Sequence, residues 1–290
     1  MLNYVVKTSG SPAFIPALNQ NPSNEDPTCF SDEDEANLLN EYFASITNIN
    51  DEDMTLPKFD KRTSSTLEFM TITKQEISDI VKCLPLNKAS GPDRISHKLL
   101  KETVNSISLP LSLLFNLSLQ KGIFPSEWKL AHVMPLYKKG DKSDVSNYRP
   151  ISVISCVGKL FERVVFKHIS NYFNENKLLY KYQAGFQTGN STVQQLIEIY
   201  HQICQALDNK EQYCMVFCDV SKAFDRVWHR GLTHKLEMYG IKGRLLNWLC
   251  NYTSHRYQKV FVKGCYSSPK LLKAGVPQGS VLGPLFLLFT

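Results

Sequence analysis

One stretch limits what this chain can fold into: an apolar run of strand length, Tyr213 to Cys218, that ends in the carboxylate of Asp219. Such a run is typical of a central strand buried on both faces of a sheet. A carboxylate beside it is costly to desolvate unless it is paired or holds a metal. Asp219, at the end of a predicted central strand, is therefore a candidate functional residue, which the spacing by itself does not establish. On spacing alone, an aspartate that caps a helix beginning near Ser221 is the alternative.

The chain is long enough, at 290 residues with 43% apolar residues, to bury a substantial core. Neither a run of about 18 uncharged apolar residues nor a signal-peptide core in Met1 to Gly10 is present in the sequence. These features predict an intracellular protein, nuclear or cytoplasmic, without membrane contact.

The cysteines are scattered, without a C-x-x-C pair or zinc-site spacing, which predicts reduced and mostly buried thiols with no disulfide partner. They are Cys29, Cys83, Cys156, Cys204, Cys214, Cys218, Cys250 and Cys265.

Charge is divided unevenly along the sequence. Residues 1–60 carry two lysines against eleven acids, whereas residues 61–290 carry 31 basic and 16 acidic residues. A positive surface attracts phosphate backbones and releases their counterions, although basic composition also occurs in proteins that bind no nucleic acid. Charge alone therefore leaves nucleic-acid binding as one of two interpretations.

The N-terminal 60 residues read as an acidic, partly disordered segment or linker. Residues 1–29 are rich in Asn, Pro and Ser and predict a flexible tail. Ser31 is the predicted N-cap of a docking helix whose apolar stripe runs from Ala36 to Ile46. The acidic cluster Asp51 to Asp53 is expected to be a solvated loop.

Further along, Thr73 and Glu76 match a capping box that opens a short helix ended by Pro85. The later elements follow from apolar periodicity and turn residues. We predict helices near residues 95–107, 109–120, 157–175, 191–208 (capped by Ser191), 222–238 and 242–252, strands at 131–137, 258–262 and 268–273, and a core helix over 281–289.

Two strings decide between the interpretations of Asp219: FCDVSKAFD at residues 217–225 and AGVPQGSVLGP at residues 274–284. They resemble motifs A and B of reverse transcriptases in the form used by non-LTR (LINE-like) retrotransposons. The resemblance extends over about 200 residues, and the further blocks come in the same order. They are GPD at 91–93, Trp128, PLYKKGD at 135–141, NYRPIS at 147–152 and QAGF at 183–186.

The resemblance implies chemistry for the first string. Nucleotide addition uses two Mg²⁺ ions about 3.5 to 4 Å apart, and Asp219 would bridge both, with Mn²⁺ as a possible substitute. The backbone at Val220 and Ser221 would lie beside the triphosphate. Phe224 would close off the 2′ side of the sugar, unless it is plain core packing, and Asp225 is expected to be structural.

It also implies nucleotide-binding residues elsewhere. Lys138 and Arg149 match the basic residues that bind the incoming triphosphate, although a solvated hairpin competes for Lys138 and Lys139 is the neighbouring alternative. Gln278 would bond the sugar or base, and Gly279 would let the backbone approach the nucleotide. The implied partners are an RNA template, a DNA primer or target and deoxynucleotides.

The resemblance implies an α+β right-hand polymerase fold, with fingers over about 74–210 and a partial palm over about 211–290. We expect an N-terminal extension at 61–110 and the reverse transcriptase domain at 111–290. Members of the family continue into an aromatic-x-Asp-Asp hairpin, which this sequence lacks before Thr290. We therefore expect a fragment without thumb or endonuclease, from a truncated gene model or a decayed element. Its apolar Tyr213–Cys218 and Val281–Phe289 segments should be exposed.

Two other functions remain open at this point. One is a catalytically dead nucleic-acid-binding remnant that keeps its basic fingers. The other is a maturase or telomerase relative, which the spacing of the 135–141 and 147–152 blocks disfavours.

The purified chain should give no DNA synthesis with an RNA template, a DNA primer, deoxynucleotides and Mg²⁺, because one aspartate cannot hold two divalent ions against water. Primer extension beside an intact reverse transcriptase measures this. Robust extension by the 290-residue chain would contradict the expectation.

Overall fold

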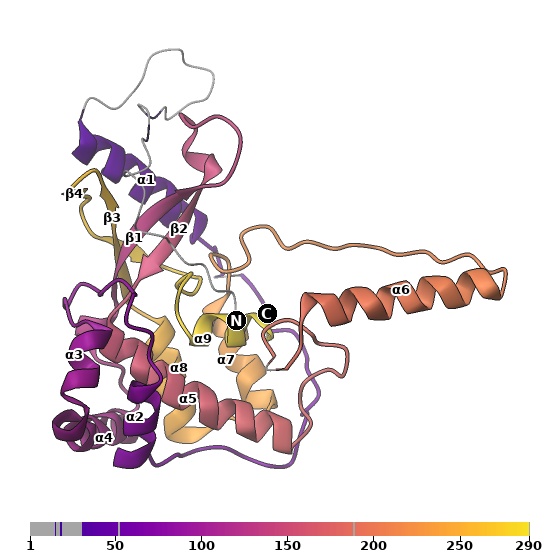
Figure 1. The fold of residues 1–290 in the computed structure, drawn as a ribbon, viewed down its shortest axis with the longest axis horizontal. Helices are drawn as coiled ribbons and strands as arrows, with labels where there is room; N and C mark the ends of the chain where they lie inside the picture. Colours follow the sequence, from indigo (N-terminus) through magenta and orange to yellow (C-terminus); the bar gives the residue numbers. More distant parts are fainter. Residues whose placement is uncertain (1–14, 16–17, 19–30, 52, 188, 290) are drawn as a thin grey trace.

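The computed structural model describes residues 15, 18, 31–51, 53–187 and 189–289. In this part of the chain, helices pack around one five-stranded sheet, so the predicted α+β class is confirmed (Figure 1). The predicted flexible tail lies outside the described residues, except for Ile15 and Leu18, which are buried.

The sheet joins two distant parts of the sequence. Its strand order is β2-β1-β3-β4, with β5 also paired to β3. β1 and β2 form an antiparallel hairpin, whereas β1 runs parallel to β3, with Leu130 opposite Tyr257. The strands are β1 Leu130–Tyr137, β2 Tyr148–Val153, β3 Arg256–Val262, β4 Cys265–Tyr266 and β5 Lys270–Leu272. The parallel pairing of β1 with β3 requires a long crossover connection. Here that connection consists of all residues between the end of β1 and the start of β3, including β2.

Helix α1 (Asp32–Ile46) covers one face of this sheet and confirms the predicted docking helix (Figure 1). The hydroxyl of Ser31 accepts from the Asp34 N–H, as an N-cap does. Leu39 and Phe43 pack with Val133 of β1 and other strand residues in a small second core.

The main core lies among the helices that gather below the sheet in Figure 1. These are α2 Lys74–Lys82, α3 His97–Glu102, α4 Val104–Lys121, α5 Cys156–Glu175, α7 His229–Met238, α8 Gly243–Thr253 and α9 Leu282–Leu287. Short 3₁₀ turns, η1 Ser126–Trp128 and η2 Val145–Asn147, precede β1 and β2.

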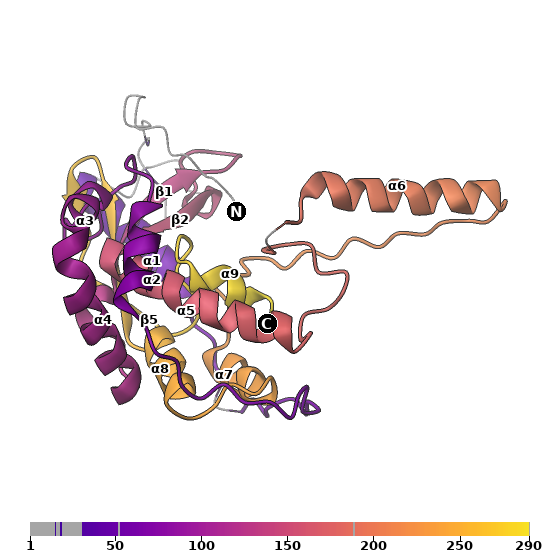
Figure 2. The same cartoon turned by 60° about the horizontal axis from the view of Figure 1, so that its bottom comes forward.

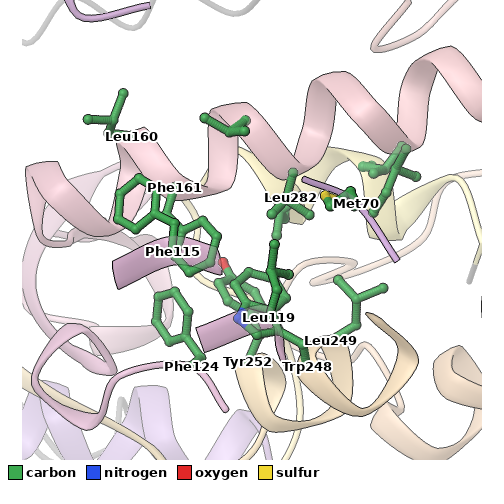
Figure 3. Close-up of a cluster of buried hydrophobic side chains, with 14 of the residues drawn as sticks. Met70, Phe115, Leu119, Phe124, Leu160, Phe161, Trp248, Leu249, Tyr252 and Leu282 are labelled. Atoms are coloured by element: carbon green, nitrogen blue, oxygen red, sulfur yellow. The ribbon is translucent and has the colours of Figure 1, made fainter. Parts of the chain in front are cut away.

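Aromatic rings from α4, α5 and α8 fill the centre of this core (Figure 3). The rings of Phe115 and Phe161 stack with centroids 4.2 Å apart, and Phe124 meets Trp248 edge-on at 5.4 Å. The buried indole N–H of Trp248 donates to the Ser118 hydroxyl at 2.9 Å, so the polar edge of the ring is satisfied.

The predicted turn at Gly91-Pro92-Asp93 docks against the start of α5. A Cβ on Gly91 would lie 2.5 Å from the backbone N of Ser155, so only glycine allows this approach. The Ser155 hydroxyl donates to the Asp93 carboxylate at 2.5 Å and accepts from the Gly158 N–H, which caps α5.

Helix α6 (Thr192–Asp208) stands away from the rest of the molecule, as both views show (Figures 1 and 2). Its predicted cap is confirmed, because Ser191 and Gln194 form a reciprocal capping box. The exposed side chains of α6 include Val193, Leu196, Ile197, Tyr200 and Leu207.

The predicted central strand at Tyr213–Cys218 is wrong for this structure. The segment runs back alongside α6 toward the rest of the molecule and belongs to none of the described strands. Val216 and Phe217 are 79% and 83% exposed, as expected for an apolar segment without neighbouring strands. A strand is stable only when adjacent strands take up its N–H and C=O groups, and the described sheet offers none here. The exposure expected for Val281–Phe289 is also wrong, because α9 packs in the main core.

Three smaller expectations also need correction. The helix predicted from residue 222 begins only at His229. Thr73 caps α2, but the Glu76 carboxylate pairs with Lys167 and His168 and so does not complete a capping box. Among the seven described cysteines, all are free thiols and only Cys156 is buried, so the predicted burial is wrong. None of the helices in the described ranges is long and apolar enough to cross a membrane.

Trp248→Ala should lower the free energy of unfolding by about 3 to 5 kcal/mol, because it opens a cavity in the aromatic core. Urea denaturation followed by circular dichroism measures the change. The matched control is Phe69→Ala, which truncates a ring that is 61% exposed and should change stability by less than about 0.5 kcal/mol. Equal losses in the two variants would contradict the placement of the core.

Candidate active site

The segment after Asp219 and the segment before α9 are held together by backbone hydrogen bonds. The N–H of Val276 donates to the Phe224 carbonyl at 2.8 Å, and the N–H of Gly275 donates to the Val227 carbonyl at 2.9 Å. These carbonyls would otherwise accept from the next helical turn, so the chain forms turns over 221–226 instead of the predicted helix. The two strings singled out in the sequence therefore meet in space.

A side-chain bond strengthens this junction. The amide nitrogen of Gln278 donates to both carboxylate oxygens of Asp225, at 2.9 and 3.1 Å. The carbonyl of Gln278 accepts from the Ser152 N–H in β2 at 2.8 Å. Asp225 and Gln278 also line a cavity of about 20 Å³, which is room for one water molecule. The side chain of Asp225 thus joins the two segments.

Burial raises the pKa of the Asp225 carboxyl, and the Gln278 bond and the Lys222 charge only partly offset that effect. The folded protein consequently holds this proton more tightly than the unfolded chain does. Ionisation of Asp225 at neutral pH therefore costs stability.

Two glycines make the close approach possible. Gly275 has φ +82° and Gly279 has φ +130°, a region that side chains rarely adopt. A Cβ on Gly275 would lie 2.7 Å from the Asp225 carbonyl oxygen, and one on Gly279 would lie 2.5 Å from the Ser152 carbonyl oxygen. The Gly279 backbone is exposed and lies against the end of β2.

The connection that returns from α6 to the rest of the molecule is exposed and carries Asp219, Val220 and Ser221. No hydrogen bond or ion pair among the described residues links Asp219 to Lys138, Arg149 or Gln278. The helix-cap alternative for Asp219 is wrong, because no helix begins beside it.

The chain turns sharply just after these residues, at Lys222, which has φ +55°. Its ammonium donates to the Tyr42 hydroxyl at 2.9 Å and lies 4.9 Å from the centre of that ring. This contact ties the segment to α1. Phe224 is partly buried and packs against the main core.

Lys138 and Arg149 belong to the β1–β2 hairpin, and both are exposed. Arg149 pairs with Leu136 across the hairpin. Lys138 follows Leu136 by two residues, so the alternation of side chains puts both basic residues on the same face of the hairpin. The N–H of Lys138 donates to the Asn147 carbonyl at 2.8 Å, which closes the predicted basic loop.

The donor set does not fit a metal centre. No group of three His, Cys, Asp or Glu residues that could hold an ion occurs within the described ranges. Asp219 offers a single carboxylate, and Asp225 is already bonded to Gln278. Taken by themselves, the described residues therefore do not form a complete metal centre.

Glu162, which no sequence motif singled out, fixes the second segment in place. This fully buried carboxylate of α5 accepts from the N–H groups of Val281 and Leu282, at 2.5 and 3.2 Å, and so holds the start of α9. A signal was present, because Glu162 interrupts the apolar stripe of the predicted 157–175 helix, where an unpaired charge is costly.

Asp225→Asn should raise the stability of the protein at pH 7, because it removes a buried charge and keeps an oxygen for the Gln278 amide. The gain should shrink toward about pH 3, where the wild-type carboxyl is protonated in the folded and unfolded states alike. Urea midpoints across this pH range measure it. Asp60→Asn, at an exposed site, is the control and should show little change at any pH. A pH-independent loss of stability in Asp225→Asn would be the contrary result.

Known proteins resemble this chain over most of its length. The family model for "Reverse transcriptase (RNA-dependent DNA polymerase)" matches residues 137–290. The probable RNA-directed DNA polymerase from transposon BS of Drosophila melanogaster is 35% identical over 274 residues, which is 92% of this chain and 29% of the relative. The polymerase from mobile element jockey of the same species is 35% identical over 219 residues, or 75% of this chain and 24% of the relative.

A more distant relative is the Pol polyprotein from the type-1 retrotransposable element R2 of Popillia japonica. It is 26% identical over 217 residues, which is 74% of this chain and 29% of the relative. The chain thus spans less than a third of the length of these curated relatives. The family model covers Lys138 and Arg149 of the hairpin and the two segments that Gln278 and Asp225 join. The chain therefore belongs to the reverse transcriptase family, in the form carried by LINE-like retrotransposons.

Proposed function

We propose that this chain is part of an RNA-directed DNA polymerase that extends a DNA primer on an RNA template. The observation that carries the proposal is a set of hydrogen bonds that we call the clasp. In it, the Gln278 side chain donates to Asp225, and the Gln278 carbonyl accepts from the N–H of Ser152 in β2. It gathers three of the blocks that resemble reverse transcriptases. We assign residues 74–210 to the fingers and 211–290 to part of the palm.

We further propose a domain division in which residues 111–290 form the polymerase domain and 61–110 its N-terminal extension. Residues 1–60 would be an acidic segment that docks through α1. The Lys222 contact with Tyr42 and the packing of α1 on the sheet support a fixed position for that helix.

Lys138 and Arg149 are proposed to bind the triphosphate of the incoming deoxynucleotide. They share one face of the hairpin, and no acidic side chain among the described residues pairs with either of them. Arg149 would bond two phosphate oxygens through its planar fork, and Lys138 would act as a point charge.

The clasped loops are proposed to shape the rest of the nucleotide site. Val220 and Ser221 would line the triphosphate, and the ring of Phe224 would exclude a 2′-hydroxyl. Gly279 leaves space for the nucleotide to approach its backbone. Gln278 donates to Asp225 but keeps its amide oxygen for the sugar or base.

Asp219 is proposed as one ligand of the catalytic Mg²⁺ or Mn²⁺. Bound in a protein of the relatives' length, the ion would supply charge neutralisation at the transferred phosphoryl group, and Asp219 would help to hold it. The described residues supply only this carboxylate, so a protein of the relatives' length would have to supply the others.

A second candidate function is nucleic-acid binding without catalysis. The exposed, isolated position of Asp219 favours it, because binding through basic side chains needs no metal centre. The two candidates differ in what happens when Asp219 is removed.

In a protein of the relatives' length that carries this segment, Asp219→Ala should lower primer extension on an RNA template by about 1,000-fold or more, because metal coordination supplies several kcal/mol at the transition state. Affinity for the primer–template, measured by fluorescence anisotropy, should stay within about twofold. Asp208→Asn, an exposed residue at the end of α6, is the control and should keep full activity. Unchanged extension in Asp219→Ala would sink the catalytic assignment, and absence of activity in the parent protein would favour the binding function.

A further inference from the structure

Helix α4 is built with small polar side chains facing inward and leucines facing outward. Ser108, Ser112 and Ser118 are buried, whereas Leu109 and Leu113 are 50% and 63% exposed. A helix at the surface of a protein usually has the reverse pattern, with its apolar side chains toward the core. The exposed apolar residues of α4 form what we call its outer face: Leu109, Pro110, Leu113, Leu114 and Leu117.

The inward side of α4 is complete without these leucines. The Ser108 hydroxyl donates to the Val104 carbonyl at 2.6 Å, and the Ser112 hydroxyl donates to the carbonyl of residue 109 at 2.9 Å. Hydroxyls that bond carbonyls of their own helix need no other partner and can be buried. Phe115 and Leu119 supply the apolar contacts of this side with the main core. The fold of the described residues therefore gives the outer face no packing role.

The outer face is one continuous apolar stripe. Leu109, Leu113 and Leu117 are four residues apart, so they lie above one another along one side of the helix. Lys121, the last residue of α4, is its only charged residue. An exposed stripe that is apolar and uncharged over several turns is typical of a surface that contacts another macromolecule.

The position of α4 leaves this stripe accessible. The helix lies at the edge of the molecule, on the side away from α6, as both views show (Figures 1 and 2). Its 18 residues extend over about 27 Å, which is long enough for a helix-to-helix contact of several turns. A second molecule can therefore approach the outer face along its whole length.

The lack of charge decides between possible occupants. A nucleic acid binds through basic side chains, and the middle of the stripe has none. A charged protein segment would likewise find no opposite charge there. A second copy of the same stripe meets the requirement, because an uncharged apolar surface is complementary to itself when two copies are related by a two-fold axis.

The single charge at the end of the helix sets the direction of such a pair. In a parallel pair the two Lys121 ammonium groups would face each other, which is unfavourable. In an antiparallel pair with the two-fold axis at Leu113, each Lys121 lies opposite Asn105 of the second copy. Antiparallel helices also bring opposite ends of their dipoles together. The antiparallel pair is therefore favoured.

A polar detail fits the same register. Pro110 lies inside α4 and has no N–H, so the carbonyl of Ser106 lacks its usual helical donor. With the axis at Leu113, Ser106 lies opposite Gln120 of the second copy, and both residues are exposed. The Gln120 amide can donate to that carbonyl across the interface.

We propose that the outer face of α4 is a dimer interface, in which α4 packs antiparallel against α4 of a second copy of this chain. The inference does not depend on the proposed polymerase function. One pair of helices buries less than the roughly 1,600 Å² of a standard protein interface, so the dimer should be weak, with a dissociation constant in the micromolar range.

The test is sedimentation equilibrium of the purified chain between about 1 and 100 μM, in reducing buffer so that exposed cysteines cannot cross-link. The wild type should shift from monomer to dimer over this range. Leu113→Lys should raise the dissociation constant of the dimer by about 30-fold or more, because two ammonium groups then meet at the axis. Leu117→Lys is a second variant and should weaken the dimer in the same direction.

A mixing experiment tests the antiparallel register. Leu113→Lys and Leu113→Glu should each be monomeric alone. An equimolar mixture should recover a dimer within about tenfold of the wild-type affinity, because opposite charges then meet at the axis. The control is Leu196→Lys on α6, which replaces another exposed leucine and should dimerise like the wild type. Circular dichroism checks that every variant is folded.

Four results would overturn the proposal. The first is a wild-type chain that stays monomeric at about 100 μM. The second is dimerisation of folded Leu113→Lys and Leu117→Lys within twofold of the wild type, and loss of the dimer in Leu196→Lys would then assign the contact to α6. The third is a mixture of the two Leu113 variants that stays monomeric. The fourth is a monomer that binds neutral phosphatidylcholine vesicles unless Leu113 is replaced by lysine, which would assign the outer face to a lipid surface.

Discussion

The buried carboxylate of Glu162 is the constraint on which the site depends. It lies inside the main core and accepts from the first N–H groups of α9, so the position of the Gln278 loop follows from it. Desolvating a carboxylate costs several kcal/mol, and burial raises the pKa of Glu162. The charge of Arg256 and the two backbone N–H groups act in the opposite direction. The site is thus held by an interaction that is costly to break.

Arg256 extends this buried polar group toward the sheet. Its guanidinium donates to the Tyr252 carbonyl at 3.0 Å and lies 4.8 Å from the centre of the Tyr252 ring. Because Arg256 begins β3, the same cluster connects α5, α8 and α9 with the parallel β1–β3 pair. Strand β2, which carries Arg149, is in turn paired with β1. The hairpin and the clasped loops therefore belong to one connected framework.

Local signals in the sequence predicted much of this framework. Ser31 and Ser191 were identified as caps because a hydroxyl can accept from an N–H two or three residues later, and the structure has both bonds. Regular apolar spacing located α5 and α8 to within a few residues. The apolar run before Asp219 was predicted to be a buried central strand, and this prediction was wrong, since burial of a strand depends on neighbours that no local pattern reveals.

The sequence alone determined which residue types could do chemistry: Asp219, the basic pair Lys138 and Arg149, and the glycine-rich loop at Gln278. Tertiary structure decided which of them meet. It joined Gln278 to Asp225, left Asp219 exposed on the returning connection, and put Lys138 and Arg149 on one face. The reason is physical: caps and periodicity act within a few residues, whereas the pairing of distant segments depends on which backbone groups and buried charges find partners when the whole chain packs.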